Sequence, residues 1–258
     1  MHWVLIILFA GLVAVLQPAA NGLKQPKSIQ ISHTGNMGVL VKGKNATWWF
    51  DGLHAFYREQ YQHLPDSLLQ LALAKKAPFD QLDGLMVSHF HRDHYSASLT
   101  KELITHSNKL IVSGSNQVGD SLPATNFLNG WNKNGIIHSD PQTGLRIESY
   151  NLAHTGSVRH REVQNIMYSL LINGVRITHV GDADEKSEEL KRPAFINADV
   201  LIVPVWFITS GAAISLLKIT KAHTIIVTHI SPGQKVDCNI GLKADVILFD
   251  QVGERLDL

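Results

Sequence analysis

Leu85-Met86-Val87-Ser88-His89-Phe90-His91-Arg92-Asp93-His94 places four potential metal ligands directly after a short apolar run. The apolar run predicts a buried strand that ends where the ligands begin. Because side chains alternate along a strand, His89 and His91 point the same way and can bind one ion, while Asp93 and His94 on the following turn can reach a second. The spacing differs from the helical H-E-x-x-H of metalloproteases, whose ligands lie four residues apart.

The residue types in this stretch indicate a catalytic rather than a structural metal site. Neutral imidazole suits zinc, and a mixed shell of imidazole and carboxylate without thiolate is typical of catalytic centres. Such a site needs ligands from elsewhere in the chain. His154, Asp182 and His229 are the candidates, since each follows an apolar run that predicts a strand. Ligands gather at strand ends because the scaffold is rigid there and the loops leave room for a substrate.

The rest of the chain predicts alternating strands and helices. Strands are expected at 28–33, 38–42, 47–50, 85–88, 109–113, 145–152, 166–172, 175–180, 200–204, 224–228 and 246–249. Helices are expected at 65–76, 96–106, 185–191 and 211–220. Neighbouring residues on a strand face opposite ways, so only one of Trp48 and Trp49 is expected in the core. The pattern is typical of an α/β fold, and we expect one domain over residues 23–258 built from two half-domains.

Residues 1–22 predict a signal peptide. Every residue from Val4 to Leu16 is apolar or Gly, which is too short a run to cross a bilayer core of about 30 Å comfortably. Ala20 and Gly22 suit the −3 and −1 positions of a cleavage site. We therefore expect an exported protein, periplasmic or secreted, with no membrane span after cleavage. An uncleaved membrane anchor and a buried first helix stay open as alternatives.

The composition limits the partners of the protein. The chain has 258 residues, of which 45% are apolar and 17% charged, enough to bury a large core. Its net charge of +1 gives no basic field of the kind that binds nucleic acid, so a small-molecule substrate is expected instead. Cys238 is the single cysteine, which excludes an intrachain disulfide. The sequence gives no prediction of oligomeric state.

These motifs, in this order, resemble those of the metallo-β-lactamase superfamily: H-x-H-x-D-H, a later His, a Gly-Asp pair and a final His. Asp51, which follows Trp48-Trp49-Phe50, also resembles the family's strand that ends in Asp. The resemblance implies a four-layer αββα sandwich with two zinc ions per chain at one edge. By position, it implies one ion at His89, His91 and His154, the other at Asp93, His94 and His229, and Asp182 as a bridge between them.

Two of these positions indicate which branches of the superfamily the sequence resembles. His91 stands where the redox di-iron branch carries Glu, which makes that branch a poor fit. A bridging carboxylate such as Asp182 is typical of the thioesterase, lactonase and phosphodiesterase branches, so hydrolysis of β-lactams is not the first expectation.

The expected function is that of a binuclear zinc hydrolase which uses a metal-bridging hydroxide on an ester-like bond, such as a lactone, thioester or amide. Asp93 is the candidate catalytic residue, because its carboxylate can orient that hydroxide. A metal-dependent phosphodiesterase and a metal-holding module without turnover are the alternatives. His33, His54 and Tyr57 are candidates for contacts behind the metals or with the substrate. Residues 159–161, Arg-His-Arg, can hold an anionic group or form a simple charged turn.

Overall fold

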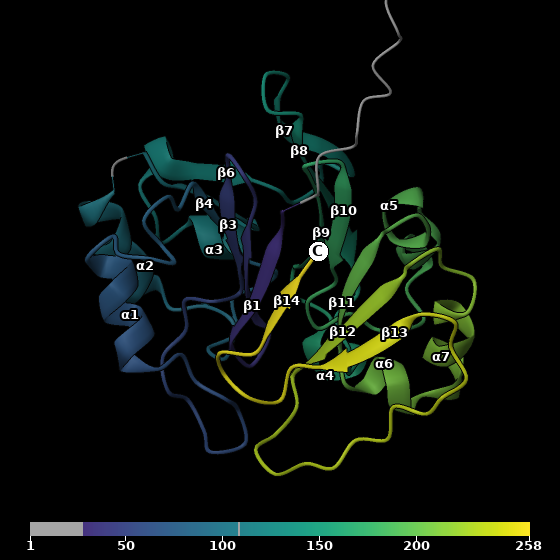
Figure 1. The fold of residues 1–258 in the computed structure, drawn as a ribbon. Helices are drawn as coiled ribbons and strands as arrows, with labels where there is room; N and C mark the ends of the chain where they lie inside the picture. Colours follow the sequence, from purple (N-terminus) through teal and green to yellow (C-terminus); the bar gives the residue numbers. More distant parts are fainter. Residues whose placement is uncertain (1–27, 108) are drawn as a thin grey trace, which may run out of the picture.

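The computed structural model describes residues 28–107 and 109–258, so the predicted signal peptide lies outside the described residues. Within these residues, two seven-stranded sheets pack face to face (Figure 1). Helices cover the outer face of each sheet, which gives the predicted four-layer αββα sandwich. None of the helices among the described residues is long and apolar enough to span a membrane.

The first sheet has the strand order β14-β1-β2-β3-β4-β5-β6. Its strands are β1 (Gln30–Gly35), β2 (Gly38–Lys42), β3 (Thr47–Phe50), β4 (Gly84–Met86), β5 (Ile111–Gly114), β6 (Phe127–Asn129) and β14 (Arg255–Asp257). The pairs from β14 to β3 are antiparallel, whereas β3, β4, β5 and β6 run parallel. β3 and β4 therefore end at the same edge of the sheet.

The second sheet has the order β13-β12-β11-β10-β9-β8-β7. Its strands are β7 (Gly135–Asp140), β8 (Leu145–Leu152), β9 (Asn165–Ile172), β10 (Val175–His179), β11 (Val200–Pro204), β12 (Thr224–Thr228) and β13 (Asp245–Leu248). The pairs from β7 to β10 are antiparallel, and β10 to β13 run parallel. β8, β10 and β12 all end at one edge, which places the segments that follow them together.

The helices are short, and most are a single turn. They are α1 (Asp66–Leu73), α2 (Ala97–His106), α3 (Asn116–Gly119), α4 (Ser157–His160), α5 (Pro193–Ile196), α6 (Trp206–Thr209) and α7 (Gly211–Leu217), with 3-10 turns η1 (Ala124–Asn126) and η2 (Glu188–Lys191). In Figure 1, α1 and α2 lie outside the first sheet, and α5 and α7 lie outside the second.

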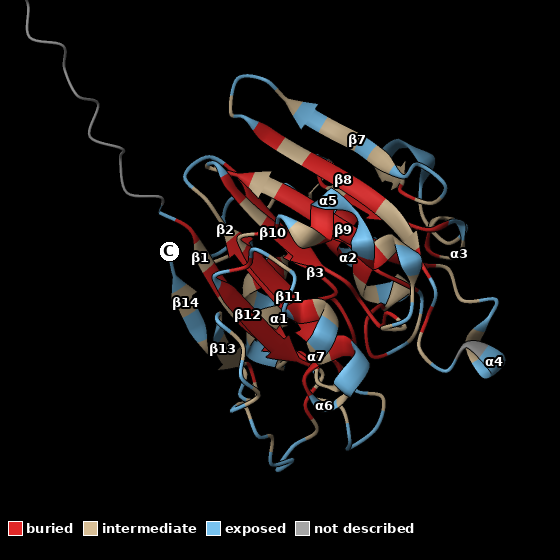
Figure 2. Cartoon of the chain, turned by 90° about the vertical axis from the view of Figure 1, so that its right-hand side faces the viewer, coloured by how far each residue is buried: buried red, intermediate tan, exposed pale blue. Residues whose placement is uncertain are grey.

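In the described part of the chain, three hydrophobic clusters lie between the four layers and hold them together. One fills the space between the sheets, and the others lie under the helices on either side. Figure 2 shows the central strands of the second sheet as almost wholly buried. Trp48 belongs to the cluster between the sheets and Trp49 to the one beneath α1 and α2. The two side chains face opposite ways as predicted, but both are core residues, because helices cover the second face as well.

The sequence predicted most central elements and missed the marginal ones. Strands β2, β3, β8, β11 and β12 have the predicted bounds. The helix expected at 185–191 is wrong in extent, since only the 3-10 turn Glu188–Lys191 forms there. Strands β6, β7 and β14 were not predicted. Their residues are mostly exposed or half-buried, so they lack the apolar periodicity on which the prediction depends.

Candidate metal centre

The seven predicted ligands converge at one edge of the sandwich, although they lie on four separate loops. The motif at 89–94 follows β4, His154 follows β8, Asp182 follows β10 and His229 follows β12. Each strand is held on both sides by its neighbours in the sheet, so the loop that follows begins from a fixed point. The arrangement falls into two groups of side chains, each of which could hold an ion.

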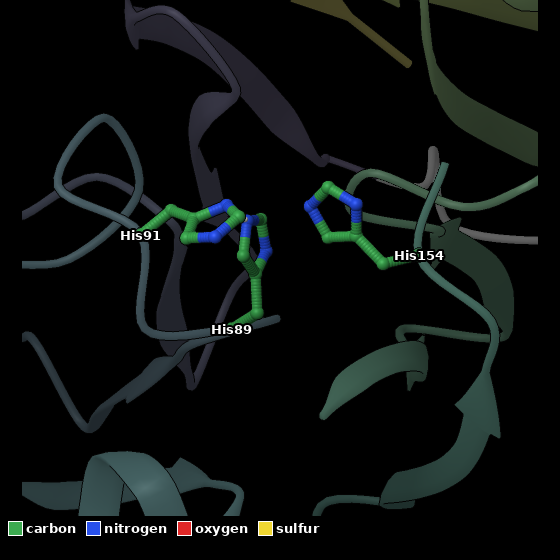
Figure 3. Close-up of side chains that lie close together, drawn as sticks. All are labelled: His89, His91 and His154. Carbon is green, nitrogen blue, oxygen red and sulfur yellow. Dashed lines mark hydrogen bonds between the residues drawn. The ribbon is translucent and has the colours of Figure 1, made fainter. Parts of the chain in front are cut away.

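The first group is made of His89, His91 and His154. One ring nitrogen from each lies within 4.8 Å of the others. Figure 3 shows His89 and His91 reaching from the loop after β4 toward His154, which approaches from the second sheet. The His89 and His154 side chains are buried and His91 is half-buried. Three imidazoles that meet without a carboxylate between them are a common zinc ligand set.

The second group is made of Asp93, His94, Asp182 and His229, whose ligand atoms also lie within 4.8 Å of one another. His94 Nε2 is 3.5 Å from Asp93 Oδ2 and 3.2 Å from Asp182 Oδ1. His229 Nε2 is 3.4 Å from Asp93 Oδ2. This group joins two imidazoles with two carboxylates, and it therefore attracts positive charge more strongly than the first.

Asp182 faces both groups. Its Oδ2 atom lies 3.9 Å from His89 Nε2 and 3.7 Å from His154 Nε2, which belong to the first group. The same oxygen lies 3.6 Å from His229 Nε2, which belongs to the second. A carboxylate has two oxygens and several lone pairs, so one side chain in this place can contact two ions.

A buried network holds His94 from behind. Asp51 Oδ2 accepts a hydrogen bond from His94 Nδ1 at 2.9 Å, and the Asp51 carboxylate also accepts bonds from the Ser88 amide and hydroxyl. Asp51 has a left-handed backbone with φ 41°, a conformation that Asp tolerates better than most residues. The network leaves His94 Nε2 facing the site, as expected of a carboxylate that orients a ligand histidine.

Asp93 is held in place by Asn36. The Asn36 side-chain amide donates to the Asp93 backbone carbonyl at 3.0 Å and to Asp93 Oδ2 at 3.2 Å. The Asn36 carbonyl in turn accepts from the His229 amide at 3.1 Å. Asn36 thus ties the loop after β4 to the loop after β12, and it fixes two predicted ligands relative to each other.

The pKa shifts differ between the two groups of side chains. Burial and the adjacent rings lower the pKa of His89 well below its usual value and that of His91 to about 4, so these imidazoles are uncharged, as metal binding requires. Burial alone would raise the pKa of Asp93 and of Asp182, but the facing histidines outweigh it and both pKa values fall, that of Asp93 to about 2. Asp182 and Asp93 outweigh burial at His229 and raise its pKa to about 9.

The residues present fit a pair of divalent ions. Four buried atoms at the centre have no hydrogen-bond partner among the described residues: His94 Nε2, His154 Nε2, His229 Nε2 and Asp182 Oδ1. Buried polar atoms without a partner are costly, and each one needs a reason. Four such atoms pointing into one site, drawn from imidazole and carboxylate groups, are explained by cations that they would share.

A cleft of about 660 Å³ opens over the site. Of the predicted ligands, it is lined by His91, Asp93, His154, Asp182 and His229. The rest of its lining is aromatic or basic, and consists mainly of Tyr57, Arg58, Tyr61, Phe90, Arg92, Arg159, His160 and Trp206. Asp93 and Asp182 are its only acidic residues among those described. A substrate that reached the metals would therefore contact rings and positive charges on the way.

The three further candidates occupy different places. Tyr57 lines the cleft. His54 is buried, bonds to the Gly35 carbonyl at 3.3 Å and does not line the cleft. His33 is also buried and bonds to the carbonyls of Gln251 and Asn36, so it reaches the site only through Asn36. Neither His33 nor His54 is placed to contact a substrate in this cleft.

The sequence did not predict the roles of some residues at the site. The Gly35-Asn36 pair carries no motif that would indicate that the Asn36 amide reaches Asp93. Tyr61 and Trp206 pack edge-on against the His229 ring at 5.5 and 5.2 Å. Neither residue belongs to a sequence motif, so only the structure identifies them as neighbours of His229.

The fold and the site define a class: a metal-dependent hydrolase fold with a paired His/Asp cluster at the sheet edge. A family model described as a beta-lactamase superfamily domain matches residues 66–229, which include all seven predicted ligands. The chain belongs to this superfamily. Comparison of the sequence with curated proteins gives no significant match.

Solved structures share this fold at low sequence identity. The metallo-beta-lactamase fold protein YhfI from Bacillus subtilis is 15% identical, with a TM-score of 0.63 over 90% of this chain and 100% of that one. Igni18, a metallo hydrolase from the archaeon Ignicoccus hospitalis, is 14% identical, with a TM-score of 0.58 over 90% and 98%. Human tRNase Z, short form, is 13% identical, with a TM-score of 0.55 over 88% and 98%. At this identity the likeness concerns the fold alone.

Proposed function

We propose that the protein is a binuclear zinc hydrolase that cleaves an ester-like bond, such as a lactone, thioester or amide, in a small molecule. The observation that carries the proposal is the position of Asp182, whose Oδ2 lies within 3.9 Å of ring nitrogens from both groups. A carboxylate in that place could contact ions held by both groups. The first ion would be held by His89, His91 and His154, and the second by Asp93, His94 and His229.

The ions would supply Lewis-acid polarisation of the scissile group and a water of lowered pKa. The chain's own residues determine where the reaction takes place. Asp93 is ionised, since its pKa is lowered to about 2, and Asn36 fixes its Oδ2 atom. An ionised carboxylate held in this way can accept a hydrogen bond from a water molecule and so orient it.

The test has two stages. Protein purified under zinc-replete conditions is expected to contain near two zinc ions per chain by mass spectrometry, and a folded protein without zinc would contradict the proposal. A panel of chromogenic lactone, thioester, β-lactam and bis-nitrophenyl phosphate substrates then identifies the bond. Preferred cleavage of the phosphate diester would replace the ester-like assignment with a phosphodiesterase, and zinc binding without turnover would indicate a metal-holding module.

Asp93→Ala tests the role of the carboxylate. We expect turnover to fall by a factor of about 100 or more, while the chain stays folded. Asp184→Ala is the control, because Asp184 belongs to neither ligand group and, among the described residues, its side chain accepts a bond only from the Lys186 amide. Wild-type turnover in Asp93→Ala would refute the role of Asp93.

We also propose that the protein is exported, on the basis of the apolar segment and the small residues at 20 and 22. Amino-terminal sequencing of the mature protein tests this, with cleavage after Gly22 as the expected result. An intact leader in a membrane fraction would indicate an anchor instead.

A further inference from the structure

The arginines at the cleft differ from those elsewhere in the fold. Arg146, Arg161, Arg176 and Arg255 each pair with a carboxylate. Among the described residues, the arginines without such a partner are Arg58, Arg92, Arg159 and Arg192. Arg58, Arg92 and Arg159 line the cleft over the metal centre. Three guanidinium groups free of a counter-charge therefore face the same cleft.

Two of these arginines converge on one ring. The Arg58 guanidinium lies 4.9 Å from the centre of the Tyr57 ring, and the Arg92 guanidinium lies 5.9 Å from the same centre. Contact with a ring face orients a guanidinium while its N–H groups stay available. The two groups come from different loops, the one after β3 and the one after β4. Each guanidinium lies within 5.9 Å of the Tyr57 ring centre, so an anion beside that ring would be attracted by both.

An aromatic wall links this basic rim to the predicted ligands. The rings of Tyr57 and Tyr61 stack at 5.9 Å and 14°. Tyr61 meets the His229 ring edge-on at 5.5 Å, and Trp206 meets the same ring at 5.2 Å. An apolar chain or a planar group lying along this wall would have one end at the metals and the other at Tyr57, two rings away.

We propose that Arg58 and Arg92 form an anion subsite, and that the substrates are small molecules with a carboxylate or phosphate separated from the scissile bond by an apolar body. The proposal rests on the hydrolase function proposed above. Arg159 adds positive charge to the same cleft from α4. The guanidinium groups are exposed to solvent, so the preference for anions is expected to weaken as salt rises.

The kinetic test compares mono-p-nitrophenyl adipate with p-nitrophenyl hexanoate, which have equal chain lengths and differ in the terminal carboxylate. We expect zinc-loaded wild-type protein to favour the anionic ester in kcat/KM by about 10-fold or more. The double variant Arg58→Gln/Arg92→Gln is expected to reduce this ratio to near one, mainly through KM. Arg192→Gln is the matched control, since Arg192 also lies over a tyrosine ring, at 5.4 Å from that of Tyr150, but outside the cleft.

A binding measurement tests the anion subsite independently of hydrolysis. Calorimetry with zinc-loaded protein compares phenylbutyrate with the uncharged phenylbutyramide. If phenylbutyrate binds more tightly than phenylbutyramide, and this preference is lost in the double variant but kept in Arg192→Gln, the subsite is supported. If the subsite is supported but neither ester is cleaved, the proposed hydrolase function is wrong and the subsite stands. Equal binding of the two compounds, or a preference that survives in the double variant because the carboxylate binds the metals, overturns the subsite.

Discussion

Asp51 Oδ2 accepts a hydrogen bond from His94 Nδ1 at 2.9 Å, in a place where both side chains are fully buried. The bond requires the tautomer of His94 that leaves Nε2 free to face Asp93 and Asp182. Asp51 does not reach the cleft, so it acts on the predicted metal site through His94 and through the Ser88 hydroxyl, whose oxygen lies 3.0 Å from His89 Nδ1. Asp51 is a positioning residue, and we expect its substitution to change the affinity for metal.

Asp51→Asn is expected to weaken zinc binding about 10- to 100-fold, because in either orientation the amide NH₂ group faces a donor, His94 Nδ1 or the Ser88 amide, and one of these bonds is lost. Asn tolerates the left-handed backbone at this position, so the substitution tests the carboxylate rather than the turn. The measurement is a competition titration against a chromogenic chelator. Asp80→Asn, which removes an exposed carboxylate paired with Lys42, is the control. Unchanged zinc affinity in Asp51→Asn would show that the bond does not orient the ligand.

Asp182→Asn is expected to lower the zinc content from near two ions per chain to about one or fewer, since Asp182 is the group that faces both halves of the site. Mass spectrometry of the native protein measures the ratio directly. Asp184→Asn is the control, because Asp184 lies two residues further on and faces neither group. If Asp182→Asn kept two ions with wild-type affinity, Asp182 would not be the bridge.

Gly52→Ala is expected to destabilise the fold by about 1 to 3 kcal/mol, because a Cβ atom at Gly52 would overlap the indole of Trp49. The Trp49 Nε1 atom donates to Thr34 at 2.9 Å, so the ring cannot shift without losing that bond. Chemical denaturation measures the change. Gly211→Ala at the start of α7 is the control, since nothing lies within 4 Å of its added Cβ. Equal stability of the two variants would mean that the loop after β3 can move away from Trp49.

The stability of the fold is expected to fall as the pH drops from 7 to 5, partly through His54. Burial is the main cause that lowers the pKa of His54 from 6.5 to about 4 in the folded chain, so the unfolded chain binds protons first as the pH falls. The contribution of His54 is complete above pH 6.5 and is lost on the way down to pH 4. Between pH 7 and 5 the loss is about 2 kcal/mol.

His54→Gln isolates this contribution. Its free energy of unfolding, measured in urea at pH 7 and pH 5, is expected to change less with pH than that of the wild type. His106→Gln, at an exposed position near the end of α2, is expected to keep the wild-type pH dependence. A wild-type slope in His54→Gln would indicate that folding does not lower the pKa of His54.

The sequence by itself determined the layered fold and the set of seven side chains at its edge. Buried strands carry their own signal, because their apolar runs and their alternation are local properties of the chain. The ligands follow such strands directly, as His154 follows β8 and His229 follows β12, so the register of the strand fixes where each side chain starts.

Only the tertiary structure decided how these side chains meet and what surrounds them. Asn36 reaches Asp93 across 57 residues of sequence, and Arg58 and Arg92 share the ring of Tyr57 although they belong to separate loops. The path of a loop depends on contacts with distant segments and leaves no periodic trace in the sequence. The contact of Asn36 with Asp93 and the basic rim of the cleft are therefore visible only once the two sheets are packed together.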